Sequence, residues 1–275
     1  PNPFTVFRLS AQKKGWKRVI ALAPFCPDKT AWQNAFAAKI IERCDGYLAI
    51  TGNSWMAFLK NSPFWHWEPK IIHLDLAVNR TDFPLIKKNF NQVKKRRFLY
   101  IGHTGWYKNI TYLEKLAQKL PETEFAWIGG NQILKNITTL GKYDFSSQEA
   151  KNLIQEYDFM ITLGSADANP TTILEAMAWG LIPVCSVQSG YAGFPSIRNI
   201  SIDCINDSLE TIKHLQSVPD EQLKKWQKEN LNELDKHFNW DRFCDQVLYE
   251  IENWKSPNLN ETNLKQRLEL FFAEF

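Results

Sequence analysis

A carboxylate and a row of backbone amides lie within about one helical turn near the middle of this 275-residue sequence. Thr171, Thr172 and Ile173 open a helical stretch, and the free N–H groups at the amino end of a helix bind phosphate. Glu175 follows one turn later. Its carboxylate would repel a phosphate but would accept hydrogen bonds from two neighbouring hydroxyls, such as those of a ribose. The combination predicts a nucleotide site.

Two buried strands and one helix must position these groups. The apolar runs 158–163 and 181–184 are typical of buried parallel strands. Between them, Asn169 is suited to the N-cap and Pro170 to the first helical position, where a backbone N–H is not needed. Gly180 is expected to end the helix in the left-handed conformation. The pattern therefore predicts a strand, a loop, a helix, a turn and a strand.

The run 167–184 resembles the signature of retaining glycosyltransferases of the GT-B fold, especially family 4, in which two acidic residues stand eight positions apart. Leu-Glu-Ala-Met-Ala at 174–178, Gly180 and the Pro-Val pair at 183–184 match that signature. Asp167 stands where the family has its first Glu, and Asn169 and Pro170 replace its Phe-Gly. The resemblance implies an α/β, GT-B-like fold of two Rossmann-like parallel-sheet domains, the first one truncated, with a nucleotide-sugar cleft between them.

A second phosphate-facing turn is expected after the apolar strand 97–102. The resembled family has Gly-Arg here, with a Lys six residues after the Gly, and the Arg and Lys hold the diphosphate. Gly102 and Lys108 keep that spacing, with Gly105 in the turn, but His103 replaces the Arg. A permanent charge is thereby exchanged for one that depends on protonation. Lys108 is then the expected stabiliser of the nucleoside diphosphate leaving group.

Tyr143 is a further candidate for the donor site. It ends a weaker strand pattern, 136–143, whose following loop lies against the nucleotide base in the resembled family. Two roles are open for the Tyr143 ring: stacking on the nucleotide base, and packing inside the domain.

The elements divide the sequence into four parts. Residues 1–84 form a partial N-terminal acceptor-side domain, with a βαβαβ pattern from residue 18 onward. Residues 85–97 are interpreted as a linker and 98–238 as the C-terminal nucleotide-sugar-binding domain. Residues 239–275 are expected to be helices that pack back on the first domain. The first domain is about half the length that the family has, so the chain is either a fragment of a longer polypeptide or has a shortened acceptor domain.

The composition excludes several classes of protein. A formal net charge of +3 is too small to favour nucleic acid as a partner. There is no apolar run long enough to span a membrane, and five scattered cysteines without metal-ligand spacing are typical of a cytoplasmic protein. The basic run at 94–97 is interpreted as a solvated linker; peripheral contact with an anionic lipid surface is the alternative.

These observations predict a hexosyl- or other glycosyltransferase that moves a sugar from a nucleoside-diphosphate sugar, with UDP or GDP, to an unknown glycan, lipid or small-molecule acceptor. The resemblance implies retention of anomeric configuration and catalytic roles for Asp167, Lys108 and Glu175. No Asp-x-Asp metal motif ends a strand, so metal-independent transfer without a cofactor is expected. Three alternatives stay open: an enzyme of the same fold with other chemistry, such as an epimerase, a non-catalytic nucleotide-sugar-binding module, and a flavodoxin-like interaction protein.

Overall fold

The computed structural model describes residues 15–27 and 33–255. The chain divides into two compact units. Unit 1 comprises Pro1–Leu76 and Asp241–Phe275, and unit 2 comprises Ala77–Trp240. The boundary therefore falls after Leu76, where the sequence placed it after residue 84. Of the helical region expected at 239–275, residues 256–275 lie outside the described residues.

Unit 1 contains a parallel three-stranded sheet in the order β1-β2-β3. The strands are β1 (Ile20–Pro24), β2 (Gly46–Ile50) and β3 (Ile71–Leu74), close to the predicted positions. Helices α2 (Gln33–Arg43) and α3 (Asn53–Phe58) connect them, followed by 3-10 turns at Leu59–Asn61 and Pro63–Lys70. Helix α9 (Trp240–Asn253) is fixed to this unit, because its Arg242 donates to the Asp75 carbonyl and its Gln246 to the His73 carbonyl.

Unit 2 is built on a six-stranded sheet in the order β6-β5-β4-β7-β8-β9, and every described pairing between its strands is parallel. The strands are β4 (Arg97–Ile101), β5 (Glu124–Ile128), β6 (Thr138–Gly141), β7 (Phe159–Thr162), β8 (Ile182–Cys185) and β9 (Arg198–Asn199). All four residues of β7 and of β8 are buried, as expected for strands covered on both faces. The chain enters at β4, winds outward through β5 and β6, and returns to wind the other way through β7, β8 and β9.

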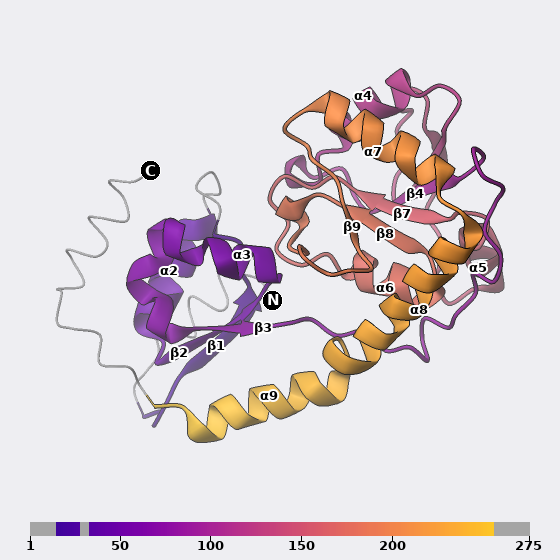
Figure 1. Ribbon diagram of the computed structural model, residues 1–275. Helices are drawn as coiled ribbons and strands as arrows, with labels where there is room; N and C mark the ends of the chain where they lie inside the picture. The colour runs from indigo at the N-terminus through magenta and orange to yellow at the C-terminus, as the bar shows by residue number, and fades with distance from the viewer. Residues whose placement is uncertain (1–14, 28–32, 256–275) are drawn as a thin grey trace. The chain divides into compact units, whose positions relative to one another are not determined.

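Helices cover both faces of this sheet (Figure 1). Helices α4 (Ile110–Lys119) and α7 (Ile205–Ser217) pack together on one face. Helices α5 (Gln148–Ile154), α6 (Thr171–Trp179) and α8 (Asp220–His237) lie on the other, where α6 contacts α8. This is the doubly wound Rossmann-like arrangement. The sequence did not predict α7 or the two-residue β9.

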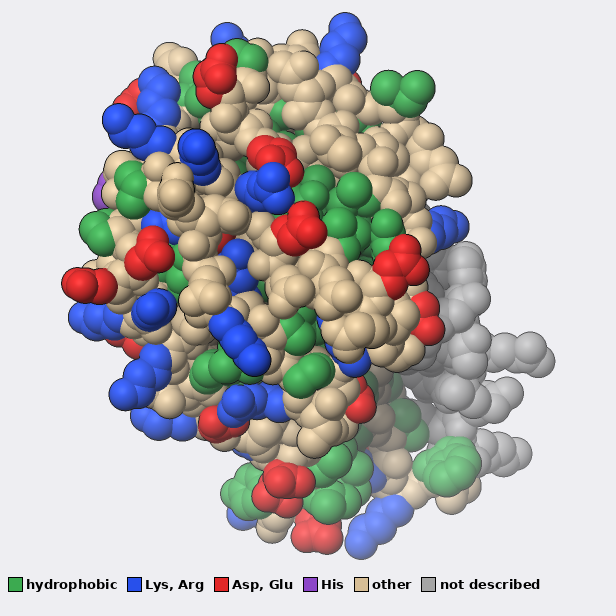
Figure 2. Space-filling view, turned by 90° about the vertical axis from the view of Figure 1, so that its right-hand side faces the viewer, with side chains coloured by type: hydrophobic (Ala, Val, Ile, Leu, Met, Phe, Trp, Pro, Cys, Tyr) green, Lys and Arg blue, Asp and Glu red, His purple; other side chains and the backbone are tan. Residues whose placement is uncertain are grey.

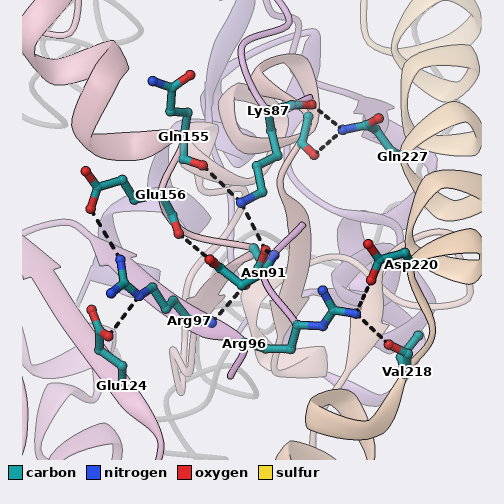
Figure 3. A network of polar contacts seen from close by, with 12 residues as sticks. Lys87, Asn91, Arg96, Arg97, Glu124, Gln155, Glu156, Val218, Asp220 and Gln227 are labelled. Carbon is teal, nitrogen blue, oxygen red and sulfur yellow. Dashed lines mark hydrogen bonds and ion pairs between the residues drawn. The ribbon is translucent and has the colours of Figure 1, made fainter. Parts of the chain in front are cut away.

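Residues 85–97 are not a solvated linker; they pack on unit 2. The Lys87 side chain is buried, and its Nζ lies 2.9 Å from Oδ1 of the buried Asp158 and donates to the Gln155 carbonyl (Figure 3). The backbone amides of Asn91 and Arg97 also donate to the Asp158 carboxylate. One buried carboxylate thus fixes the segment that leads into β4, because each of these donors compensates the charge removed from water.

In the part of the chain that the structure describes, no helix combines the length and the apolar character needed to cross a membrane.

Candidate functional site

The reversal of strand order between β4 and β7 defines where a ligand is expected to bind in unit 2. Their neighbours β5 and β8 continue the sheet in opposite directions. The loops that follow two such strands therefore part, and in open parallel sheets ligands bind at this switch point, beyond the carboxyl ends of the strands. Here these loops are residues 102–109 and 163–170. They carry Gly102, His103, Gly105 and Lys108 on one side and Asp167 and Asn169 on the other.

Lys108 and Asp167 meet across the switch point. Lys108 Nζ lies 2.5 Å from Asp167 Oδ2, and both side chains are largely buried. The Lys108 ammonium group also lies 5.4 Å from the centroid of the Tyr107 ring, a cation–π contact. The Ser165 amide donates to the Tyr107 carbonyl, which joins the two loops through their backbones. Two of the three predicted catalytic residues are thus in direct contact.

The His103 ring is held within its own loop. Its Nδ1 accepts from the Gly105 amide at 2.9 Å, and its Nε2 lies 2.9 Å from the Tyr107 hydroxyl. A Cβ on Gly105 would lie 2.6 Å from the ring, so a side chain at this position would displace His103 from these contacts. Burial, followed by the charge of Asp167, raises the pKa of Tyr107, so this hydroxyl stays protonated. His103 therefore orders the loop that carries Lys108.

Two glycines allow the ends of β4 and β5 to approach closely. Gly102 has φ +155°, and its carbonyl accepts from the Trp127 indole at 2.7 Å. A Cβ on Gly129, which has φ +142°, would lie 2.1 Å from the same carbonyl. A side chain at Gly129 would therefore push the loop after β4 away from β5, and a Cβ at Gly102 would lie 2.8 Å from the Tyr100 hydroxyl.

The amino end of α6 differs in detail from the prediction. Pro170 is the N-cap, in place of Asn169, and the helix begins at Thr171. Three backbone amides, those of Thr171, Thr172 and Ile173, were predicted to donate hydrogen bonds to a phosphate. The Ile173 amide already donates to the Pro170 carbonyl. Thr171 is exposed and Thr172 is partly exposed. Gly180, with φ +90°, ends α6 in the left-handed conformation, which confirms the prediction.

Glu175 lies one turn into α6 and is partly buried. Burial raises the pKa of its carboxyl group, and a hydrogen bond with the Thr171 side chain lowers it by less. A carboxylate that is partly withdrawn from water gains more from a hydroxyl donor than an exposed one does.

A third loop, after β8, supports the loop that carries Asp167. The Asp167 amide donates to the Gln188 carbonyl, and the Ser186 hydroxyl donates to the Gly164 carbonyl at 2.5 Å. The Tyr191 hydroxyl donates to Asn169 Oδ1. The sequence motifs did not single out Tyr107 or Tyr191 as residues of the site. The adjacency of Tyr107 to Lys108 was the available signal.

Tyr143 follows β6, which ends at Gly141. Burial is the main cause that raises the pKa of Tyr157, and Glu124, Glu156 and Tyr143 add to it, so Tyr143 lies near Tyr157, the second residue before β7. Among the described residues, no three His, Cys, Asp or Glu side chains are grouped so that they could hold a metal ion.

Solved structures share this fold. A sucrose-phosphate synthase from Thermosynechococcus elongatus superposes with a TM-score of 0.70 and 13% identity, over 91% of this chain and 70% of that one. A UDP-forming α,α-trehalose-phosphate synthase from Burkholderia xenovorans gives a TM-score of 0.65 and 10% identity, over 91% and 71%. Anabaena HepE, in complex with UDP and glucose, gives 0.64 and 9%, over 85% and 71%.

The similarity to these structures is one of fold. No model of a known protein family matches the sequence, and no curated protein matches it. The three structures cover both units of the chain and are glycosyltransferases of the GT-B fold. The chain therefore has a GT-B-like fold, with a Rossmann-like parallel sheet in each unit, as the sequence predicted.

Proposed function

We propose that this chain is a glycosyltransferase whose donor, a nucleoside-diphosphate sugar, binds at the switch point of unit 2. The observation that carries this proposal is the contact between Lys108 and Asp167, a cation and an anion brought together beyond the ends of β4 and β7. A donor substrate needs both, since its diphosphate is negative and its sugar carries hydroxyls. The structural similarity to transferases, one of them in complex with UDP and glucose, supports the same assignment.

Each residue then has a separate task. Lys108 and the amides of Thr171 and Thr172 hold the diphosphate, which carries more charge as the anomeric bond breaks. Glu175 accepts hydrogen bonds from the ribose hydroxyls, and Asp167 accepts from the sugar. In the transfer, the bond from the anomeric carbon to the phosphate oxygen breaks and a bond to the acceptor oxygen forms. The proton of the acceptor hydroxyl passes to the departing phosphate.

We further propose that transfer retains the anomeric configuration and proceeds without a metal ion or cofactor. The support for retention is the sequence signature, and the support for metal independence is a lysine and helix amides at the position of the leaving group. The acceptor is a glycan, a lipid or a small molecule. UDP is the first nucleotide to test, because HepE is described with UDP.

A non-catalytic nucleotide-sugar-binding module is the second candidate, and the His103 loop favours it. The His103 ring is engaged with Gly105 and Tyr107, so it offers no permanent charge where the resembled family has an arginine. The diphosphate would then have Lys108 as its one cationic side chain from this loop, which suits binding better than cleavage.

Calorimetric titration with UDP, GDP and ADP tests the site. The wild-type chain is expected to bind one of them, and Glu175→Ala is expected to lose most of that affinity, since a charged hydrogen bond contributes ~1.5–3 kcal/mol. Glu149→Ala, an exposed acid early in α5, is the matched control. Equal affinities in wild type and Glu175→Ala would refute the ribose assignment.

Turnover separates the two candidates. The transferase is expected to release nucleoside diphosphate from UDP-glucose or another nucleotide sugar, slowly with water and faster with an acceptor. Tight binding with no release under any condition would leave the binding module as the function.

A further inference from the structure

A groove with basic side chains lies at the edge of the unit 2 sheet opposite to the candidate donor site. Its volume is about 630 Å³, and its lining includes Lys94, Lys95, Arg96, Arg97, Glu122 and Glu124. Arg97 and Glu124 are the first residues of β4 and β5, so the groove lies at the amino ends of these strands. A five-residue strand spans roughly 16 Å, which separates the groove from Lys108 and Asp167.

Surface charge alone would not identify a site on this protein. On the face shown in Figure 2, lysine and arginine side chains are interspersed with aspartate and glutamate over much of the surface. Two further properties distinguish the groove: a buried arginine with unsatisfied donors, and a pair of lysines on a rigid turn.

Arg96 is the buried arginine. Its side chain is fully buried, and its Nη2 donates to Asp220 Oδ1 at 2.6 Å and to the Val218 carbonyl at 2.9 Å (Figure 3). Its Nε and Nη1 have no hydrogen-bond partner among the described residues. Buried donors are almost always satisfied in folded proteins, so these two atoms call for an acceptor that the protein chain does not supply.

The lysine pair stands on a turn that Gln216 holds. The Gln216 carbonyl accepts from the Lys94 amide, while its side chain accepts from the Arg96 amide and donates to the Arg96 carbonyl. Lys94 has φ +68°, and the Lys95 amide closes the turn on the Gln92 carbonyl. Both lysines are exposed and form no ion pair within the described part of the chain. The backbone that carries the two lysines is therefore already ordered, so only their side chains lose conformational freedom when an anion binds.

We propose that this groove binds a phosphate group, carried either by a soluble phosphate compound or by a lipid headgroup. A guanidinium group and two ammonium groups match the several oxygens and the charge of a phosphate. Arg97 is not counted, because Glu124 and Glu156 pair with it. The Arg96 charge is balanced by Asp220, so the excess positive charge of the groove comes from Lys94 and Lys95, against Glu122. The site is independent of the proposed transferase function.

The test uses inorganic pyrophosphate as the probe in calorimetric titrations of the full chain. The variant Lys94→Glu/Lys95→Glu is expected to weaken pyrophosphate binding at the groove at least about ten-fold. Lys224→Glu/Lys225→Glu, an adjacent exposed pair on α8, makes the same change in net charge and is expected to leave the affinity unchanged. Lys108→Ala removes the cation of the donor site, so it identifies any pyrophosphate that binds there.

Arg96→Gln provides a second variant, because it removes the buried guanidinium without touching the lysines. It is expected to weaken pyrophosphate binding as well, with circular dichroism and thermal unfolding to show that it folds. The decisive comparison remains the lysine pair, whose exposed side chains can change without unfolding the protein.

Co-sedimentation with vesicles distinguishes the two sources of phosphate. Binding to phosphatidylcholine vesicles that contain phosphatidylglycerol, absent with phosphatidylcholine alone and lost in Lys94→Glu/Lys95→Glu, would assign a lipid headgroup. Pyrophosphate binding without vesicle binding would assign a soluble compound. The proposal is overturned if pyrophosphate binding disappears with Lys108→Ala yet persists in Lys94→Glu/Lys95→Glu, or if neither probe binds.

Discussion

Lys108 and Asp167 form an ion pair of 2.5 Å between the loops that follow β4 and β7. Each charge compensates the other while both side chains are largely withdrawn from water. A diphosphate that reaches Lys108 must therefore compete with Asp167 for the same ammonium group. This competition makes the two residues respond in opposite directions to substitution.

Replacement of Lys108 by alanine is expected to lower the affinity for UDP about ten- to a hundred-fold, because a hydrogen bond to a charged group contributes ~1.5–3 kcal/mol. Isothermal titration calorimetry measures this. Lys115→Ala, an exposed lysine on α4, removes the same charge elsewhere and should bind UDP like wild type. If both variants bound UDP equally well, Lys108 would not hold the diphosphate.

Asp167→Asn is expected to raise the affinity for UDP, because the lysine no longer has an anionic partner in the chain. The same variant should lower turnover of the nucleotide sugar, since the amide is a weaker acceptor for the sugar hydroxyls. The Asp167→Asn variant is thus expected to bind UDP more tightly than wild type and to turn over the nucleotide sugar more slowly. An Asp167→Asn variant that bound UDP as weakly as Lys108→Ala would show that the ion pair positions Lys108 and does not compete with the ligand.

Glu175→Gln is expected to stabilise the protein near pH 8 and to weaken UDP binding. Burial raises the pKa of this carboxyl group in the folded state, so ionising it costs more when folded than when unfolded. The cost is absent below the unfolded pKa and fully present above the folded pKa. The gain in melting temperature should therefore be largest at high pH and vanish as the pH falls toward 4.

Thermal unfolding of both proteins from pH 4 to 8, in one buffer series, measures this difference. Glu149→Gln, which changes an exposed acid on α5 in the same way, is the matched control. A melting-temperature difference that is constant with pH would mean that Glu175 does not titrate with a raised pKa.

The sequence predicted most of the switch-point side of unit 2, because the signals there are local. The predominantly apolar β7 and β8, and Gly180 at the end of α6, are each recognisable within a few residues. Lys108 and Asp167 were predicted from their separate motifs, and the order of the strands brings them together. Their contact itself could not be predicted from either motif.

The missed features depend on partners that are distant in the sequence or on details of the backbone. Lys87 has the sequence context of a linker lysine, and its burial follows from its pairing with Asp158, which directly precedes β7. Ser147 caps α5, where its hydroxyl accepts from the Ala150 amide, whereas the hydroxyl of the neighbouring Ser146 donates to Asp144.

Lys87→Met is expected to destabilise unit 2 by about 3–5 kcal/mol, because it leaves the buried Asp158 carboxylate without its cation. The amides of Asn91 and Arg97 still donate to this carboxylate, which favours the lower end of that range. Urea denaturation measures the change, and Lys88→Met, its exposed neighbour, should alter stability little. Equal stabilities for the two variants would mean that the Lys87–Asp158 ion pair does not stabilise the fold, and that a methionine side chain packs as well as Lys87 does.

Gly129→Ala and Gly193→Ala separate two costs of a side chain at positive φ. A Cβ at Gly193, with φ +74°, meets nothing within 4 Å, so this variant should lose only the conformational ~1–2 kcal/mol. A Cβ at Gly129 would lie 2.1 Å from the Gly102 carbonyl, so the backbone itself must move. We expect Gly129→Ala to cost several kcal/mol more than Gly193→Ala in urea denaturation.

The displaced carbonyl gives Gly129→Ala a second, functional effect. Gly102 leads into the loop that carries Lys108, and its carbonyl accepts from the Trp127 indole. A shift of the Gly102 carbonyl is expected to weaken UDP binding. The affinity is measured at a temperature at which the Gly129→Ala variant is still folded. A Gly129→Ala protein that folds, with the stability of Gly193→Ala and unchanged UDP affinity, would show that the loop after β4 does not depend on this close approach.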